Sequence, residues 1–195
     1  MKTVYVITHP DVVIDPNVPV PNWPLSVKGR QRMENLLDEP WLKTITAVYS
    51  SDERKALDGA MILADQLGLT VIQQAGLEEV DRSSTGYLPV EQHDFNAELL
   101  FKHPADSVDG WETAEHAQKR MVAAVDQLIQ ADQTAGSLVI VTHGAVGSFL
   151  MSHLRKASIT IADSPNVSGG GGIFSFDSET KTVLSDWQNI DNAQF

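Results

Sequence analysis

Residues 137–144 read Ser-Leu-Val-Ile-Val-Thr-His-Gly, and this segment indicates the class of fold. Its first six residues form a near-continuous apolar run, which is typical of a strand buried on both faces of a parallel sheet. His143 and Gly144 follow at once, and a helix is expected from there to about Leu154. A buried strand, a polar tip and a helix make the repeating unit of an α/β sheet.

The same alternation of strands and helices extends on both sides of this unit. Strands are expected at 3–8, 44–50, 69–72, 173–176 and 183–187, and helices at 26–38, after Ser51-Asp52 to Leu67, at 90–101 and at 111–130. Gly68 stands where a helix commonly ends. The pattern predicts an α/β fold, a three-layer α/β/α sandwich with a mostly parallel sheet, as one domain over residues 1–195.

The composition excludes several classes of protein. The 195 residues include no cysteine, so disulfides, thiolate zinc sites and cysteine nucleophiles are excluded. A formal charge of −12 argues against nucleic acid as a partner. No apolar run is long enough for a membrane span, and residues 1–7 are expected to be the first strand, not a signal peptide. A cytoplasmic protein is expected, and its oligomeric state, a homodimer included, stays open.

Candidate functional residues lie at three strand tips. His9 follows the first strand, residues 50–54 follow the second, and His143 follows the buried strand. In open α/β sheets ligands bind outside the carboxyl ends of the strands. Arg54 stands in the first turn after a strand, where helix N–H groups also attract anions. An isolated histidine is more often a structural loop residue, but two at one sheet edge indicate a site.

These segments resemble conserved motifs of a known family. Thr8-His9-Pro10 is similar to an Arg-His-Gly signature, and Leu77-Glu78-Glu79 fits a Leu-x-Glu motif. Further similar segments, in the same order, are residues 24–31, 49–56, 110–113 and 139–144. Together they resemble the histidine phosphatase superfamily, the phosphoglycerate mutase-like proteins. Residues 81–89 and 169–172 resemble a distinct bacterial branch of it.

The resemblance implies a mechanism. The residue matching the family's nucleophile is His9, which would attack phosphorus and form a phosphohistidine. His143 and Arg54 match positions that hold the phosphoryl oxygens, and Gly144 lies beside them. Glu79 matches the acid that protonates the leaving group, and the adjacent Glu78 stays an alternative. No metal or cofactor is implied, and the expected ligand is a small phosphorylated substrate or inorganic phosphate.

Two departures from the signature bear on activity. Thr8 replaces an arginine, removing a fixed charge and a forked donor from the phosphate pocket. Pro10 replaces a glycine, removing a backbone N–H. Arg82 is a candidate to fill the space beside Thr8, although an exposed loop arginine is an equal alternative. Gly169–Gly172 precedes a strand and is expected to bring backbone close to the site.

Three functions are compatible with these residues. The first is a metal-independent phosphatase acting on a small metabolite, with a lid at about 83–107. The second is a catalytically weak or silent phosphate-binding or regulatory protein on the same fold. The third is a metallohydrolase using His9, His143 and carboxylates such as Asp11, which lacks closely spaced ligands. A mutase is less favoured, because the family's mutases usually carry a longer insertion.

Overall fold

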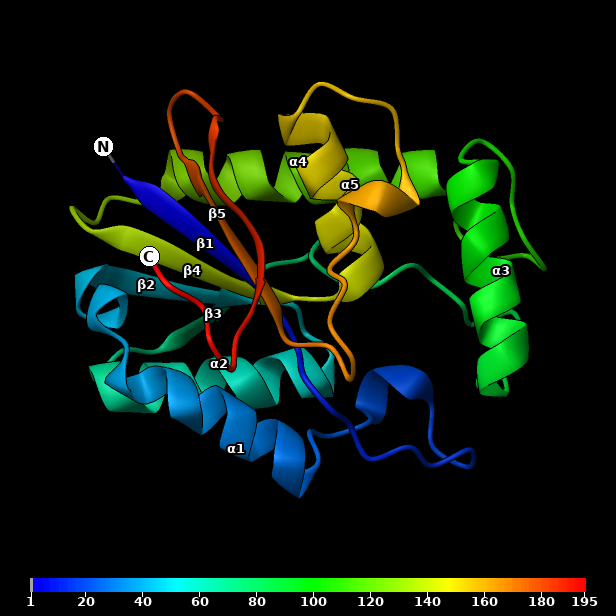
Figure 1. Ribbon diagram of the computed structural model, residues 1–195, viewed down its shortest axis with the longest axis horizontal. Coiled ribbons are helices and arrows are strands. Elements are labelled where there is room, and N and C mark those ends of the chain that lie inside the picture. The colour runs from blue at the N-terminus through cyan, green and yellow to red at the C-terminus, as the bar shows by residue number, and fades with distance from the viewer. Residues whose placement is uncertain (1) are drawn as a thin grey trace.

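The computed structural model describes residues 2–195 and contains one six-stranded sheet in the order β3-β2-β4-β1-β5-β6 (Figure 1). Strands β1 to β4 pair in parallel, while β5 and β6 run antiparallel at one edge. The strands are β1 (Thr3–Thr8), β2 (Ile45–Ser50), β3 (Val71–Gln73), β4 (Ser137–Thr142), β5 (Gly172–Asp177) and β6 (Val183–Asn189). The sheet is mostly parallel, as the sequence predicts.

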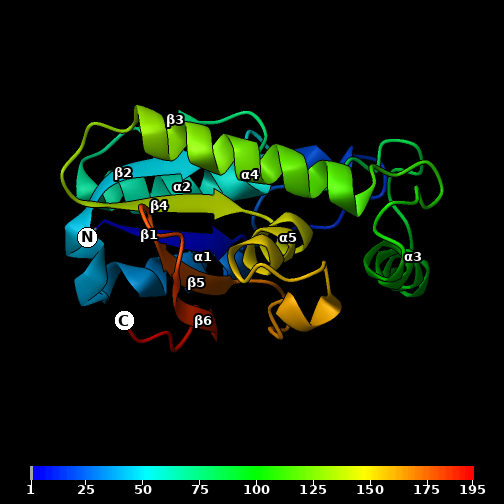
Figure 2. The same cartoon turned by 90° about the horizontal axis from the view of Figure 1, so that it is seen from above.

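Helices cover both faces of this sheet. In Figures 1 and 2, α1 and α2 lie on one face and α4 and α5 on the other, which confirms the predicted α/β/α sandwich. The α-helices are α1 (Val27–Asn35), α2 (Arg54–Leu67), α3 (Val90–Lys102), α4 (Ala114–Ala131) and α5 (Gly144–Leu154). Short 3-10 helices occur at Val20–Asn22, Leu36–Asp38, Pro40–Thr44 and Ile161–Asp163.

The apolar run of β4 is explained by two separate cores. Leu138 and Ile140 pack into the core under α4 and α5, whereas Val139 and Val141 pack into the core over α1 and α2. Successive strand residues point to opposite faces, so a strand between two layers must be apolar at every position.

Local capping sets the helix ends and corrects three expected boundaries. The helix expected from 111 begins at Ala114, because the Thr113 hydroxyl accepts the His116 N–H at 3.2 Å. The helix expected over 26–38 is α-helical only to Asn35 and then tightens into a 3-10 turn. Ser51 does not cap α2, since its hydroxyl accepts the Glu53 N–H at 3.2 Å, one residue before the helix.

Helix α3 stands beside the sandwich at the end where the parallel strands terminate (Figures 1 and 2). It belongs to the segment 83–107. Its contact with the sandwich includes the buried Leu100 and the ring of Phe101, whose centroid lies 5.2 Å from that of Phe149. Within residues 2–195, no helix combines the length and apolar character needed to cross a bilayer.

Candidate active site

His9 and His143 meet at one edge of the sheet. Strands β1 and β4 are parallel neighbours in which Thr8 pairs with Thr142, so the next residue of each leaves the sheet at the same level. The His9 N–H continues the ladder by donating to the Thr142 carbonyl at 3.0 Å. The two imidazole ring centroids lie 5.1 Å apart, edge to face.

The His9 ring is held in one orientation. Its Nδ1 lies 3.0 Å from the Pro10 carbonyl oxygen, which assigns the proton to Nδ1 and leaves the Nε2 lone pair free. Burial, and secondarily the charge of Lys55, lower the pKa of His9 to about 4. At neutral pH the ring is therefore uncharged, the form that a nucleophile requires.

His143 is fully buried. Its Nε2 lies 2.9 Å from the Ser51 hydroxyl and 3.6 Å from Glu53 Oε1. Burial lowers the pKa of His143 well below its usual value, so this ring is also neutral. Its Nδ1 has no hydrogen-bond partner within the part of the chain that the structure describes.

An ion pair that the sequence motifs did not indicate completes the buried side of the site. Glu53 and Lys55 are both buried and their side chains are paired. Glu53 Oε1 accepts the Glu79 N–H at 2.8 Å, and Lys55 Nζ donates to the Val20 carbonyl at 3.1 Å. Burial opposes ionisation of Glu53, but the charge and hydrogen bond of Lys55 and the Glu79 N–H outweigh it and lower the pKa of Glu53 to about 2.

Arg54 faces solvent and not the histidines, contrary to the sequence expectation. Its side chain is 56% exposed and Nε donates to Asp58 Oδ1 at 2.7 Å. The neighbouring Lys55 is 3% exposed and takes the inward position. The signal was in the helix periodicity, because Lys55 precedes the buried Gly59 and Leu63 by four and eight residues and so shares their face.

Glu78 and Glu79 point in different directions. The Glu79 carboxylate accepts the N–H groups of Ala145 and Val146, at 3.2 and 3.3 Å, at the start of α5. Glu78 instead accepts the Gly76 N–H and pairs with Arg120 at 3.2 Å. Glu79 therefore lies at the N-terminus of the helix that follows His143, next to the histidine pair.

The Thr8 hydroxyl is already bonded to the protein. Thr8 is buried, and its Oγ1 accepts the Gly172 N–H at 2.9 Å, which ties the start of β5 to the tip of β1. Two of the preceding glycines lie close to the same tip, and the Gly171 N–H donates to the His9 carbonyl oxygen at 3.2 Å. Gly170 has a φ of +72°, and a Cβ there would lie 2.4 Å from the His9 carbonyl oxygen, so only glycine fits.

Two cavities adjoin the site. The acidic cavity has a volume of about 890 Å³ and the His9 cavity about 570 Å³. The acidic cavity is lined by Pro16–Pro21, Asp52, Glu53, Glu78–Ser83, Gly86, Tyr87, Glu112 and Arg120. The His9 cavity is lined by Thr8, His9, Glu79, Val80, Arg82, His93, Asp94, Ala97, Leu100, Phe101, Trp111, Gly144, Ala145, Ser148, Ser164, Pro165, Val167 and Gly170.

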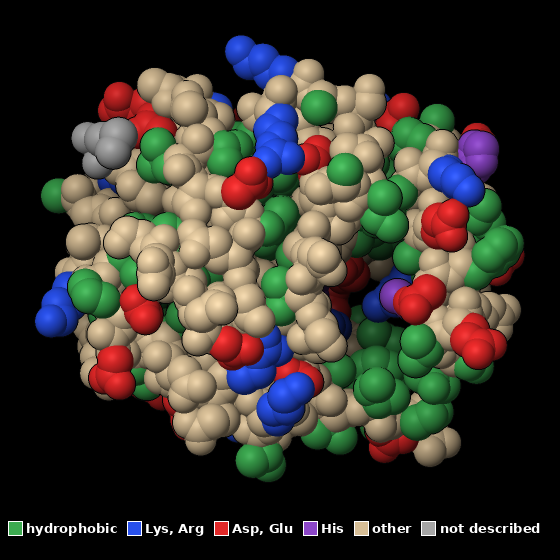
Figure 3. All heavy atoms as spheres, viewed as in Figure 1, with side chains coloured by type: hydrophobic (Ala, Val, Ile, Leu, Met, Phe, Trp, Pro, Cys, Tyr) green, Lys and Arg blue, Asp and Glu red, His purple; other side chains and the backbone are tan. Residues whose placement is uncertain are grey.

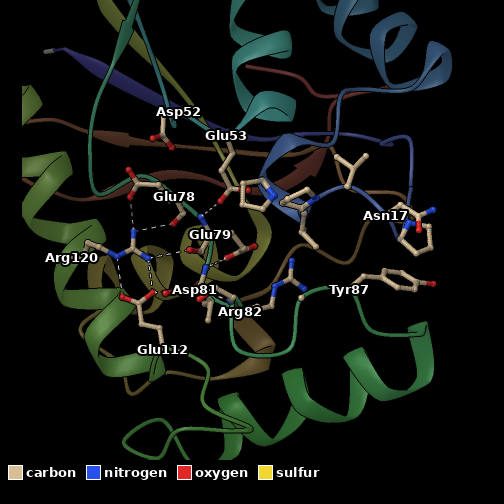
Figure 4. A pocket seen from close by; sticks show the side chains of 18 residues that line it. Asn17, Asp52, Glu53, Glu78, Glu79, Asp81, Arg82, Tyr87, Glu112 and Arg120 are labelled. Carbon is tan, nitrogen blue, oxygen red and sulfur yellow. Dashed lines mark hydrogen bonds and ion pairs between the residues drawn. The ribbon is translucent and has the colours of Figure 1, made fainter.

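Arg82 lies between the two cavities and lines both. In Figure 4 its guanidinium points into the acidic cavity, while Arg120 lies between Glu78 and Glu112. The Arg82 guanidinium carbon is 5.5 Å from the centroid of the Trp111 ring. Among residues 2–195 the Arg82 side chain donates no hydrogen bond, so its five N–H donors are available to a ligand.

The described residues contain no group of three or more His, Asp or Glu side chains placed to hold a metal ion. Of the residues predicted from sequence, the structure gathers Thr8, His9, Glu79, Arg82, His143 and Gly144 at one sheet edge, and it places Arg54 outside.

Comparison with known proteins places the chain in a family. The profile of the histidine phosphatase superfamily (branch 1) matches residues 18–186. The match starts after β1, so it does not include His9. No curated protein matches the chain.

Solved structures share the fold. Mycobacterial glucosyl-3-phosphoglycerate phosphatase Rv2419c with inorganic phosphate is 18% identical, with a TM-score of 0.77 over 99% of this chain and 100% of that chain. Its complex with VO3 is 18% identical, with a TM-score of 0.74 over 96% and 97%. Bacillus stearothermophilus YhfR is 20% identical, with a TM-score of 0.76 over 100% and 98%. The predicted fold class is confirmed.

Proposed function

Because the chain belongs to branch 1 of the histidine phosphatase superfamily, we propose that it is a metal-independent phosphatase acting through a phosphohistidine at His9. The observation that carries this proposal is the state of His9: a neutral imidazole, fixed at Nδ1 by the Pro10 carbonyl, lining a cavity that the free guanidinium of Arg82 also lines. The proposed substrate is a small phosphorylated metabolite.

In the first step, His9 Nε2 attacks phosphorus and the bond from phosphorus to the ester oxygen breaks. The leaving alkoxide takes a proton from Glu79 in its acid form. In the second step, water attacks the phosphohistidine, Glu79 accepts a proton from that water, and the P–N bond breaks to release inorganic phosphate. The same carboxylate thus acts as acid and then as base.

Charge on the phosphoryl oxygens is neutralised by Arg82, which lines the same cavity as His9. Phosphoryl transfer depends mostly on such placement and charge stabilisation. Arg82 replaces the charge that Thr8 does not supply. Phosphate-type ligands also occupy the similar mycobacterial phosphatase, whose structures hold inorganic phosphate or VO3.

A second candidate is a phosphate-binding or regulatory protein with little or no turnover. Two observations favour it: the Thr8 hydroxyl is engaged by the Gly172 N–H, and the Glu53 carboxylate neutralises Lys55. On that proposal the site would bind phosphate without forming a phosphohistidine.

Turnover of p-nitrophenyl phosphate in EDTA separates the candidates. We expect turnover in the wild-type protein, its loss by at least about 10³-fold in His9→Ala, and a trapped acid-labile phosphohistidine in the wild type alone. His153→Ala, which removes an exposed imidazole from α5, is the matched control and should be unchanged. Phosphate binding without turnover would support the second candidate, and turnover abolished by EDTA would contradict both.

A further inference from the structure

The two cavities beside Arg82 differ in chemistry. Six carboxylate side chains line the acidic cavity, against the two cations Arg82 and Arg120. Eight of the eighteen residues around the His9 cavity are apolar: Val80, Ala97, Leu100, Phe101, Trp111, Ala145, Pro165 and Val167. In Figure 3 the surface is hollowed between the sandwich and the α3 side, with hydrophobic side chains gathered below the hollow.

The phosphoryl group attacked by His9 must lie in the cavity that His9 lines, so the alcohol portion begins there, beside Glu79, which lines both cavities. His9 is among the residues that line the largely apolar His9 cavity, and it does not line the acidic cavity. Carboxylates of the acidic cavity are also committed to other partners, since Arg120 pairs with Glu78 and Glu112 at 3.2 and 2.7 Å. The acidic cavity therefore has no free cation for an anionic leaving group beyond Arg82, which it shares with the His9 cavity.

Apart from His9 Nε2 and the Arg82 guanidinium, several polar groups around the His9 cavity are already bonded to the protein. Ser148 Oγ donates to the Gly144 carbonyl at 2.7 Å, and the Trp111 Nε1 donates to Thr85 Oγ1 at 2.9 Å. The Glu79 carboxylate accepts the N–H groups at the start of α5. Asp94 is 70% exposed, which places its carboxylate at the solvent side. The inner surface therefore presents mainly aliphatic and aromatic carbon.

From these observations we infer that the His9 cavity accepts the uncharged, apolar or aromatic alcohol portion of a phosphate monoester. The inference rests on the proposed function and names its substrate class. A carboxylate on the alcohol would find no fixed cation beyond Arg82, which the phosphoryl group occupies, and the other ring at this cavity, His93, has its Nδ1 3.1 Å from Asp94. The volume of about 570 Å³ lies within the usual range for small-molecule sites, and an aromatic ring would pack against Phe101 and Trp111.

Calorimetric binding of phosphonates tests the inference without requiring turnover. Benzylphosphonate should bind at least about tenfold more tightly than phosphonoacetate, which carries a carboxylate in place of the ring. Phe101→Ala should lower the affinity for benzylphosphonate by about 3- to 10-fold and leave the affinity for methylphosphonate unchanged. Phe95→Ala is the matched control, because Phe95 lies on the same helix, is 61% exposed and does not line the cavity.

A gain of affinity guards against misfolding as an explanation. Ala97 lines the His9 cavity from α3. Because Ala97→Lys adds a cation there, it should raise the affinity for phosphonoacetate and lower the affinity for benzylphosphonate. Equal wild-type affinities, or tightest binding of the cationic aminoethylphosphonate, would overturn the inference. If the protein hydrolyses p-nitrophenyl phosphate but binds benzylphosphonate no more tightly than phosphonoacetate, the inference is overturned and the proposed function stands. If benzylphosphonate binds more tightly but p-nitrophenyl phosphate is not hydrolysed, the inference stands and the proposed function is overturned.

Discussion

The buried floor of the site differs from its open wall. The floor comprises Ser51, Glu53, Lys55 and His143, all buried and bonded mainly to one another. The wall comprises His9, Glu79 and Arg82, which line a cavity. In the floor, the charges of Glu53 and Lys55 neutralise each other. The wall instead presents the free Nε2 of His9 and the free guanidinium of Arg82 to the cavity. Substitutions in the floor should therefore cost folding stability first, and those in the wall should cost chemistry.

Removing the cation of the floor should give the largest effect on stability. Lys55→Met leaves the Glu53 carboxylate buried without its counter-charge, and we expect a loss of about 3–5 kcal/mol in the free energy of unfolding. Urea denaturation measures it. The double variant Glu53→Gln/Lys55→Met should recover most of the loss, because no unpaired charge then remains.

Arg54→Met is the control for this prediction. Arg54 is the adjacent residue but is exposed, so the free energy of unfolding should change by no more than about 0.5 kcal/mol. If the two single variants lose equal stability, the distinction between a buried floor and the solvent-facing side of α2 is wrong.

The pair Arg54 and Lys55 also shows where sequence reasoning succeeds and where it stops. Strand tips are local features: the apolar run of β4 and the proline after His9 locate both histidines without any knowledge of tertiary structure. The choice between two adjacent cations depends on which side of α2 meets the sheet. The motif spacing placed Arg54 in the site, and the helix packs Lys55 there instead.

Glu53 could not have been assigned from the sequence. Its carboxylate is fixed by the Glu79 N–H, 26 residues away, and it lies near His143, 90 residues away. Such contacts arise from the order of strands in the sheet, in which β4 lies between β2 and β1. Alternation of strands and helices predicts a mostly parallel sheet, but it does not fix the order in which the strands pair.

Among the wall residues, Arg82→Ala should lower kcat/KM much more than it lowers the free energy of unfolding. If Arg82 neutralises the phosphoryl oxygens, its loss should cost about 2.7–4 kcal/mol of transition-state stabilisation, which is a 10²- to 10³-fold fall in kcat/KM. The free energy of unfolding should change little, since Arg82 donates no side-chain hydrogen bond to residues 2–195. Steady-state kinetics with p-nitrophenyl phosphate provide the measurement, and unchanged turnover would remove Arg82 from the site.

The pH dependence of stability reports the burial of both histidines, His9 of the wall and His143 of the floor, in an upper pH window and that of Glu53 in a lower one. Burial, then the charge of Lys55, lowers the pKa of His9 from 6.5 to about 4. Between these values the unfolded chain binds a proton that the folded chain does not, so stability should fall as the pH decreases from 6.5 to 4. For Glu53, whose pKa is about 2 against 4.5, the loss comes at lower pH, between 4.5 and 2.

His9→Gln should reduce the slope of unfolding free energy against pH in the upper window only. His153→Gln, at an exposed position, should leave it unchanged. The acidic side of the pH profile of kcat/KM should reflect the same pKa. Because the His9 imidazole is neutral above about pH 4, its ionisation should not limit kcat/KM between about pH 5 and 7. A slope unaffected by His9→Gln would show that the ring titrates near its usual pKa.

The smallest effect is expected at Thr8, which lines the cavity but behaves as part of the floor. Thr8→Val removes the acceptor of the buried Gly172 N–H, and an unsatisfied donor there should cost about 1–2 kcal/mol in the free energy of unfolding. Thr8→Ser keeps the hydroxyl and should retain most of that stability. Turnover should stay near the wild-type value in both, because the hydroxyl bonds to β5 and not to the ligand. If Thr8→Val instead loses turnover while remaining fully stable, the hydroxyl contacts the phosphoryl group, and the wall of the site begins one residue earlier than the geometry indicates.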